Sequence, residues 1–399
     1  MRVLVCAEEA PLPPMNGFRS AVASLTEHLR KANEVRVLAY RRSDQQGAGP
    51  DDMRLLPRPD AGKAEKAKLV TRAVARRRPL RADALAHGMA QALAEEIERF
   101  RPDVVHVTAG RLGALGRSLE GRASVLVALD APHLNLEARA EHAPVLMRGL
   151  LRGEAGRMQR FAAEEWHRFG SVVVVSAEDA DALRATDPRM AIEVIPGGID
   201  PEPYAPRPHV PRVPGRIMFH GILDYAPNVS AAEFLARRIL PLVRARRPDA
   251  ALVLVGRSPA PEVRALGRLD GVSIAADVPD VGEWLSTAAA YACPMRSGTG
   301  VKNKLLEAMA NELPCVVTPL ALRGLSAKPG RDVLTGEGEQ DLAANVLRLI
   351  EDGRFAATLG KKGAAYVASA HDWDVIARSY EGLYRRIAGS TLDRPAERR

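Results

Sequence analysis

Residues 289–318 read AAYACPMRSGTGVKNKLLEAMANELPCVVT. The apolar run 289–293 predicts a strand, the small residues 297–300 predict a turn, and a helix begins at about Val301. The apolar run 315–318 then predicts a second strand. Strands that alternate with helices in this way belong to a parallel sheet with helices on its faces. This stretch therefore predicts the α/β fold class.

The same alternation continues outward through the rest of the chain. The predicted strands are nearly continuous in apolar and β-branched residues, as expected for strands covered on both faces. The first half contains predicted strands at 2–7, 34–39, 103–108, 124–129, 171–175 and 193–195. The second half contains predicted strands at 216–220, 251–255, 272–275, 289–293, 315–318 and 332–334.

A proline-rich segment separates the two halves. Residues 196–215 contain seven prolines, and because proline fixes φ and blocks regular strand pairing, the segment predicts a stiff linker. We predict two Rossmann-like, doubly wound domains that face each other across a cleft, with ligands beyond the carboxyl ends of the strands. The predicted parts are an N-terminal domain at 1–196, the linker at 197–215, a C-terminal domain at 216–372, a helix at 373–388 that crosses back to the N-terminal domain, and a tail at 389–399.

The composition is that of a globular protein. The chain has 399 residues, of which 46% are hydrophobic and 27% charged. Cys6, Cys293 and Cys315 lie in apolar runs without the spacing of metal ligands or of a disulfide framework, so we expect buried free thiols. The N-terminus does not resemble a signal peptide and no apolar run is long enough to span a membrane, so we expect a cytoplasmic protein.

Most of the net charge of +8 lies in one segment. Residues 61–81 contain eight basic residues and one acidic residue, a net +7, and no nucleic-acid-binding motif accompanies them, so we expect no nucleic-acid partner. Apolar residues at 69, 70, 73 and 74 predict a basic amphipathic helix. Three interpretations stay open: peripheral contact with anionic membrane lipid near a lipid-linked acceptor, recognition of an anionic small-molecule acceptor, or a solvated loop.

The helix that begins near Val301 has two unlike faces. One face is apolar, and the opposite face carries Asn303, Lys304, Glu307 and Asn311. A helix that packs on a core with its polar face in solvent also explains this pattern. However, Lys302 and Lys304 lie in the first turn, where each positive charge opposes the helix dipole by about 0.3–1 kcal/mol. A bound diphosphate would reverse that penalty, and Glu307 is spaced to bond a ribose.

Several stretches resemble a known family. GTGVKNKLLEAMANELPCVVT, at 298–318, resembles the donor-binding motif of the family-4 glycosyltransferases of the GT-B fold, especially a bacterial branch associated with polysaccharide and natural-product sugar transfer. Other similar stretches follow in the family's order: PLPPMNGFRSAVASLTEHL at 11–29, RPDVVHV at 101–107, VIPGGID at 194–200, FHGILDYAPN at 219–228 and LVLVGRSP at 252–259. The resemblance implies a retaining glycosyltransferase that uses a nucleotide sugar.

The resemblance also implies roles for residues of the donor site. The residue that matches Glu307 binds the donor ribose in this family, and the preceding turn contacts the sugar and phosphates. The family often has an acid where this sequence has Thr299, and an Arg and a Lys in the loop that here reads GILDYAPN. We expect lysines of the helix start, with Arg257, to replace that pair. The predicted donor-binding residues are Gly17, Gly221, Asn228, Arg257, Gly298, Thr299, Gly300, Lys302, Asn303, Lys304 and Glu307.

On the acceptor side, three residues follow or end predicted strands. His133 is our predicted catalytic residue, because the family often has a histidine in this loop that contacts the transferred sugar. His106 and Arg19 are the predicted acceptor-binding residues. In a front-face reaction the leaving phosphate oxygen accepts the acceptor's proton, so we expect neither a metal ion nor a cofactor beyond the nucleotide-sugar substrate.

Two other functions remain open at this stage. The same fold supports sugar-nucleotide epimerases and hydrolases, although Thr299 stands where an acid would act. A non-catalytic subunit that binds nucleotide sugars is the second alternative, since the family's Arg and Lys pair is missing.

Overall fold

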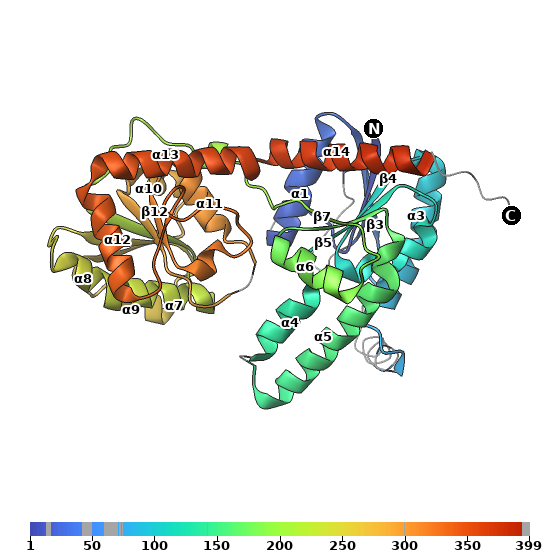
Figure 1. Cartoon of the computed structure of the whole chain (residues 1–399), viewed down its shortest axis with the longest axis horizontal. Coiled ribbons are helices and arrows are strands. Elements are labelled where there is room, and N and C mark those ends of the chain that lie inside the picture. Colours follow the sequence, from blue (N-terminus) through green and yellow to red (C-terminus); the bar gives the residue numbers. More distant parts are fainter. Residues whose placement is uncertain are drawn as a thin grey trace. The chain divides into compact units, whose positions relative to one another are not determined.

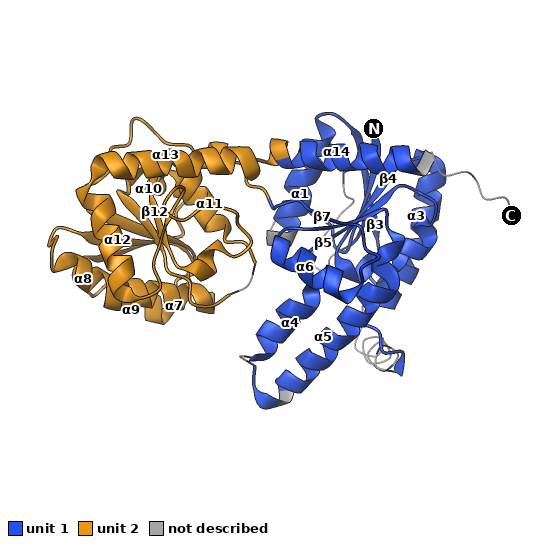
Figure 2. Cartoon of the chain, in the orientation of Figure 1, with its two compact units in different colours: residues 1–197, 376–399 blue, residues 198–375 orange. Residues whose placement is uncertain are grey.

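Two parallel sheets organise the chain (Figure 1). The computed structural model describes residues 1–12, 17–41, 50–59, 71, 73, 75–141, 143–298 and 300–392. The chain divides into unit 1, residues 1–197 and 376–399, and unit 2, residues 198–375 (Figure 2).

The described residues of unit 1 form a seven-stranded sheet in the order β3-β2-β1-β4-β5-β6-β7, and every pairing is parallel. The strand order reverses between β1 and β4, which is the switch point at which open α/β sheets bind ligands. β3 was not predicted from the sequence. The strands are β1 (Arg2–Ala7), β2 (Glu34–Tyr40), β3 (Met53–Leu56), β4 (Val104–Thr108), β5 (Ser124–Leu129), β6 (Ser171–Val174) and β7 (Ile192–Val194).

Unit 2 repeats this plan with six strands among the described residues, in the order β10-β9-β8-β11-β12-β13, again all parallel. Its switch point lies between β8 and β11. The strands are β8 (Arg216–Ile222), β9 (Ala251–Arg257), β10 (Val272–Ala276), β11 (Ala290–Cys293), β12 (Cys315–Val317) and β13 (Leu334–Thr335).

Helices pack on both sheets, and strands such as β4, β6 and β11 are buried along their whole length. Among the described residues, no helix combines the length and the apolar character needed to cross a membrane. Unit 1 contains α1 (Gly17–Arg30), α3 (Ala82–Phe100), α4 (Pro132–Glu141), α5 (Val145–Glu165), α6 (Ala177–Thr186) and the short helices η1 (Gly110–Leu119) and η2 (Trp166–Arg168). Unit 2 contains η3 (Glu202–Tyr204), α7 (Ala226–Phe234), η4 (Leu235–Ile239), α8 (Leu240–Arg244), α9 (Pro261–Leu266), α10 (Val281–Thr287), α11 (Asn303–Ala310), η5 (Pro319–Leu322), α12 (Glu339–Glu351) and α13 (Gly353–Ala370).

The proline-rich segment is part of unit 2 instead of a separate spacer. Asn311, at the end of α11, is fully buried, and its Nδ2 donates to the Tyr204 carbonyl and to Ser286 Oγ, both at 2.9 Å. The Val213 amide donates to the Thr287 carbonyl at 2.8 Å. The Asn311 side chain and the backbone at the end of α10 thus hydrogen-bond to this segment. The predicted linker is therefore a fixed strap on unit 2.

The C-terminal helix corrects one prediction about the acceptor side. α14 (Trp373–Leu392) begins in unit 2 and continues in unit 1. The hydroxyl of Tyr384, on this helix, lies 2.6 Å from His106 Nδ1 in β4, and the His106 side chain is only 1% exposed. The prediction that His106 binds the acceptor is wrong, because α14 covers it. Burial lowers the pKa of His106 to about 3.

We predict that His106 makes the protein less stable in mild acid. In the unfolded chain this histidine has a pKa of 6.5, so below that pH the unfolded state binds a proton that the native state, with a pKa of about 3, does not. Stability is therefore full above pH 6.5 and falls as the pH drops, by about 2 kcal/mol at pH 5. Urea unfolding at pH 8 and pH 5 measures this loss. His106→Gln should show a shallower pH dependence, and an equal slope in both proteins would contradict the assignment.

Candidate functional site

The candidate site lies at the switch point of unit 2, where β8 and β11 end. Gly221 in β8 pairs with Gly256 in β9, and a Cβ on Gly256 would stand 1.8 Å from the Gly221 carbonyl oxygen. β11 ends at Cys293, and α11 begins at Asn303. Because glycine has no side chain, the backbones of β8 and β9 can approach each other closely at these strand ends. This is where open α/β sheets bind their ligands.

The glycine turn is held by a lysine. Gly298 and Gly300 have φ of 101° and 72°, a region that favours glycine. Lys302 is 7% exposed, and its Nζ donates to the carbonyls of Gly298 at 3.3 Å and Gly300 at 2.6 Å. Burial, with a smaller contribution from Lys304, lowers the pKa of Lys302. We predicted Lys302 as a partner of the donor phosphates, but in this structure its ammonium group binds the turn.

Lys304 instead lies over the end of β8. Its Nζ donates to Asn228 Oδ1 and stands 4.8 Å from the centre of the Phe219 ring. Asn228 is fixed in turn, because its Nδ2 donates to the Ile222 carbonyl at 2.8 Å. Burial lowers the pKa of Lys304. An ammonium group that has lost water in this way gains strongly from an anionic ligand.

We predict that Gly221→Ala displaces Lys304. Gly221 has a φ of 154°, and a Cβ there would stand 2.8 Å from Lys304 Nζ and 2.9 Å from Asn228 Nδ2. The added methyl group must push the lysine away, so we expect nucleotide-sugar affinity to fall by about tenfold, roughly one charged hydrogen bond. Calorimetry with the donor measures this effect. Gly338→Ala, where an added Cβ would meet open space, is the matched control.

Glu307 lies one turn after Lys304, beside two residues that we did not predict. His220 Nε2, in β8, donates to Glu307 Oε2 at 2.7 Å, and the His220 side chain is 5% exposed. Tyr204 lies close to the carboxylate of Glu307, and burial together with this carboxylate raises the pKa of Tyr204 well above its usual value. His220 lies within the stretch 219–228 that resembles the family, which was the available signal, whereas Tyr204 lies in the proline-rich segment outside these stretches. The bond from His220 fixes the Glu307 carboxylate, which is 21% exposed.

The other predicted donor residues lie around this centre. Asn303 is exposed and is the first residue of α11. Arg257 is exposed at the end of β9, and within the described parts of the chain it makes no ion pair. Thr299 falls outside the described residues. In unit 1, Gly17 is the first residue of α1 and Arg19 is buried on that helix.

Unit 1 has a pocket at its own switch point. The pocket has a volume of about 370 Å³ and lies beyond the ends of β1, β4 and β5. Ala109 and Leu129, at two of these strand ends, have φ of 95° and 67°, which is strained for residues with a Cβ. The residues that line the pocket are Glu8, Glu9, Ala109, Gly110, Arg111, Ala128, Leu129, Asp130, Pro132, Asn135, Leu136, Arg139 and Met158.

Asp130, not His133, faces this pocket. His133 is 5% exposed on α4 and is not among the lining residues, and burial lowers its pKa. Burial, with the nearby Asp179, raises the pKa of Asp130 to about 6. We predicted His133 because it follows β5, but α4 begins at Pro132 and turns the histidine inward. Asp130 is the titratable side chain that this strand end presents.

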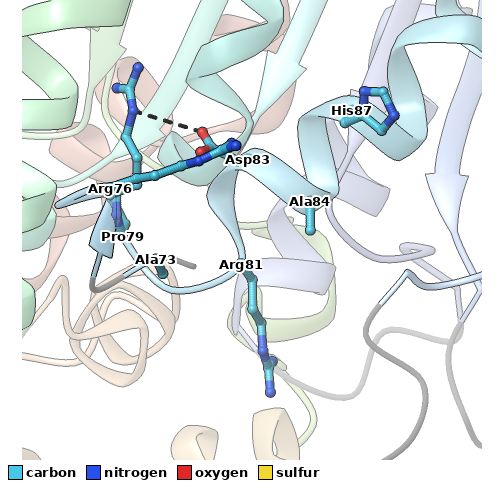
Figure 3. Close-up of a pocket in the computed structure, with 8 residues that line it drawn as sticks. Ala73, Arg76, Pro79, Arg81, Asp83, Ala84 and His87 are labelled. Atoms are coloured by element: carbon cyan, nitrogen blue, oxygen red, sulfur yellow. Dashed lines mark ion pairs between the residues drawn. The ribbon is translucent and has the colours of Figure 1, made fainter. Parts of the chain in front are cut away.

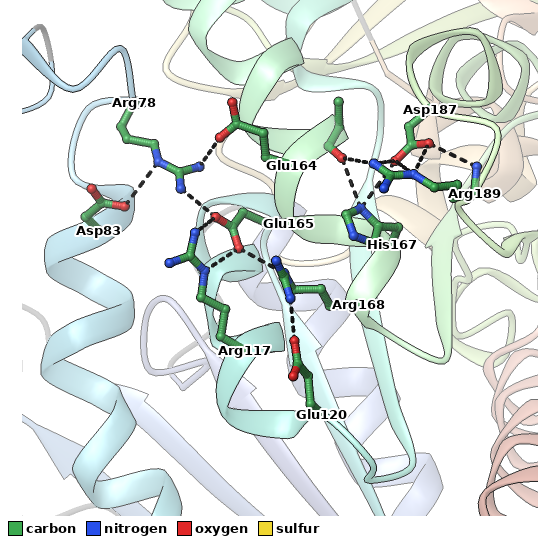
Figure 4. A network of polar contacts seen from close by, with 11 residues as sticks. Arg78, Asp83, Arg117, Glu120, Glu164, Glu165, His167, Arg168, Asp187 and Arg189 are labelled. Atoms are coloured by element: carbon green, nitrogen blue, oxygen red, sulfur yellow. Dashed lines mark hydrogen bonds and ion pairs between the residues drawn. The ribbon is translucent and has the colours of Figure 1, made fainter. Parts of the chain in front are cut away.

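The basic segment is only partly visible, since residues 60–70, 72 and 74 lie outside the described residues. Its described end borders a pocket of about 270 Å³ with Arg76, Arg81 and His87 in the wall (Figure 3). Arg78 pairs with the fully buried Glu165 of α5, as does Arg117 (Figure 4). Burial alone would raise the pKa of Glu165. The hydrogen bonds and charges of these arginines outweigh burial and lower the pKa, so the carboxylate stays ionised. This ion-pair network anchors the end of the segment to α5.

No group of three or more His, Cys, Asp and Glu side chains that could hold a metal ion occurs within the described ranges. All three cysteines are buried and free, as the sequence predicted.

Two Rossmann-like units, with a glycine turn and helix at the second switch point, define a GT-B protein. The model described as "Glycosyltransferase Family 4" matches residues 15–203, and the model described as "Glycosyl transferases group 1" matches residues 214–352. The chain belongs to the family-4 glycosyltransferases, and the predicted family and fold are confirmed.

The chain is also similar to individual proteins and solved structures. A phosphatidyl-myo-inositol mannosyltransferase of Mycolicibacterium smegmatis is 29% identical over 220 residues, which cover 50% of this chain and 53% of that protein. The chain thus spans about half the length of the curated relative it matches. Sucrose-phosphate synthase of Thermosynechococcus elongatus has a TM-score of 0.69 at 17% identity, over 98% of this chain and 100% of that one. Anabaena HepE, solved with UDP and glucose, has a TM-score of 0.64 at 14% identity, over 97% and 100%.

Proposed function

We propose that this chain transfers a sugar from a nucleoside diphosphate sugar to an acceptor, with retention of configuration and without a metal ion. The observation that carries the proposal is the pair of side chains on α11, the Lys304 ammonium and the Glu307 carboxylate, one turn apart at the switch point of unit 2. Lys304 faces the donor diphosphate and Glu307 accepts hydrogen bonds from the ribose. That HepE was solved with UDP and glucose supports a nucleotide-sugar donor.

The chemistry follows from where charge develops. When the bond between the anomeric carbon and the phosphate oxygen breaks, negative charge builds on the diphosphate and positive charge on the sugar. The desolvated Lys304 and the first amides of α11 stabilise the diphosphate, so a metal ion is not required for that task. The departing phosphate oxygen takes the acceptor hydroxyl proton on the face that it leaves, and the acceptor oxygen bonds the anomeric carbon on that same face. Lys302 supports this step by holding the glycine turn.

For the acceptor we propose the pocket of unit 1 that Asp130 lines. Its raised pKa gives Asp130 a fraction in the protonated form near neutral pH, so it can donate as well as accept hydrogen bonds from a hydroxyl-rich acceptor. Natural products, glycans and lipid-linked molecules all offer such hydroxyls. The mycobacterial relative is named as a mannosyltransferase of phosphatidyl-myo-inositol, and this name favours a lipid-linked acceptor.

A panel of uridine, guanosine, adenosine and thymidine diphosphate sugars in a thermal-shift assay identifies the donor. The same donor is then incubated with candidate acceptors, with and without EDTA, and the released nucleoside diphosphate is measured. Release that depends on the acceptor and survives EDTA, with the donor's anomeric configuration kept in the product by NMR, is the expected result. Epimerised or hydrolysed donor would instead favour the second function, and binding without turnover a non-catalytic subunit.

A further inference from the structure

α4 and α5 form a helical hairpin in unit 1. The two helices pack against each other and project from the sheet (Figure 1). α4 leads away from the end of β5, and α5 leads back toward β6. The end of α4 and the first turns of α5 therefore form the tip of the hairpin, and Pro132 and Met158 lie at its base.

The tip exposes large apolar side chains. Val145 is 83% exposed, Met147 50% and Leu150 63%. Ten large apolar residues are exposed across the described residues, and these three fall within six consecutive positions. Single exposed apolar residues are ordinary on a protein surface, but a group this dense marks an interaction surface.

The same turns carry positive charge. The sequence APVLMRGLLRG, at 143–153, contains Arg148 and Arg152 and no acidic residue. Arg148 donates to the Ala143 carbonyl at 3.3 Å, and Arg152 is exposed and forms no ion pair within the described part of the chain. Glu141, the last residue of α4, is the acidic residue at the tip, and Glu154 is neutralised by Arg157 at 2.7 Å. Apolar side chains flanked by arginines match the interface of an anionic bilayer, where the apolar groups enter the acyl boundary and the guanidinium groups meet phosphates.

The base of the hairpin lines the pocket of unit 1. Pro132, Asn135, Leu136 and Arg139 of α4 and Met158 of α5 all contribute to its wall. Leu134, which is 39% exposed, lies on α4 beside these residues. The helices that carry the apolar tip thus also carry the pocket.

We propose that the tip of the α4–α5 hairpin docks on an anionic lipid bilayer. Docking holds the pocket at the base of the hairpin beside the lipid surface. The contribution of docking to catalysis rests on the proposed function, in which that pocket binds the acceptor. The basic segment 61–81 is not required for this contact.

Co-sedimentation of the full chain with vesicles tests the proposal. Phosphatidylcholine vesicles with and without phosphatidylglycerol are compared at low and high salt. The wild-type chain should bind the anionic vesicles, less so at high salt. The triple variant Val145→Ser, Met147→Ser and Leu150→Ser should bind at least about tenfold more weakly, since each lost apolar contact adds to the loss. Arg148→Gln with Arg152→Gln should remove most of the salt dependence.

Matched variants make the result decisive. Val213→Ser with Leu242→Ser removes exposed apolar side chains elsewhere and should leave vesicle binding unchanged. Because the three tip residues are exposed, the triple variant should keep the wild-type melting temperature and donor affinity. Failure of the donor site would abolish donor binding in both proteins and leave vesicle binding intact, so the two failures are distinguishable. Three results would overturn the proposal: no vesicle binding by the wild type, loss of binding only when Arg76 and Arg77 are replaced, or a wild-type dimer in light scattering that the triple variant converts to monomer.

Discussion

Lys304→Met should lower the turnover rate at saturating donor by about 10²- to 10³-fold. Lys304 lies over the end of β8 and is held by Asn228. In the proposed reaction, negative charge develops on the leaving diphosphate at this position. A preorganised donor at such a position has this effect on turnover when it is removed, because the water that could replace it must reorganise during the reaction. Steady-state kinetics with the identified donor and acceptor give the turnover rate.

The control for this variant is Lys361→Met, which removes an exposed lysine from α13 and should leave turnover unchanged. The melting temperature should not fall in Lys304→Met, since burial lowers the pKa of this lysine and the folded protein gains little from its charge. A turnover rate within about threefold of the wild type would show that Lys304 does not face the diphosphate.

Glu307→Ala should weaken nucleotide-sugar binding by about 1–3 kcal/mol, or 5- to 150-fold. Because His220 Nε2 donates to the carboxylate at 2.7 Å, the carboxylate is already oriented before the ribose binds. Titration calorimetry measures the dissociation constant directly. Glu307→Gln is less informative, since an amide still accepts a hydrogen bond from a ribose.

Glu262→Ala, at an exposed position on α9, serves as the control for the removal of a carboxylate. Glu307→Ala also leaves His220 Nε2 without its partner, so its fold is checked by circular dichroism before binding is interpreted. Donor affinity equal to that of the wild type in a folded variant would remove Glu307 from the site.

The fold was largely predictable because its strands are buried on both faces. β1 and β5 have the predicted ends, since polar or turn residues bound each apolar run sharply. β3, with the sequence MRLL, escaped prediction because it is short and carries an arginine. Residues 197–215 were predicted as a linker because proline content does not reveal what a segment packs against, and residues from 198 onward belong to unit 2.

Two parts of the candidate site were predicted: residues that share the polar face of one helix, and Gly221 and Asn228 in the stretch that resembles the family. Lys304 and Glu307 follow from the polar face of α11, whereas His220 is 87 residues away and meets Glu307 only through the strand order. The bonds from Lys302 to the glycine turn depend on the φ values of Gly298 and Gly300. A pattern of apolar and polar residues does not predict these φ values.

Long-range packing explains the acceptor-side errors in the same way. His106 was predicted to face a ligand because it lies near the end of a strand. Tyr384, 278 residues later, covers it, and nothing in the sequence around β4 signals that contact.

The proposed function requires that unit 2 bind the donor with Lys304 on the diphosphate and Glu307 on the ribose. A crystal structure of the chain with the nucleoside diphosphate sugar that gives the largest thermal shift tests this most directly. We predict phosphate oxygens within hydrogen-bond distance of Lys304 Nζ, beside Gly221, and ribose hydroxyls on the Glu307 carboxylate. A nucleotide bound without contact to either side chain would rule out this arrangement of the donor.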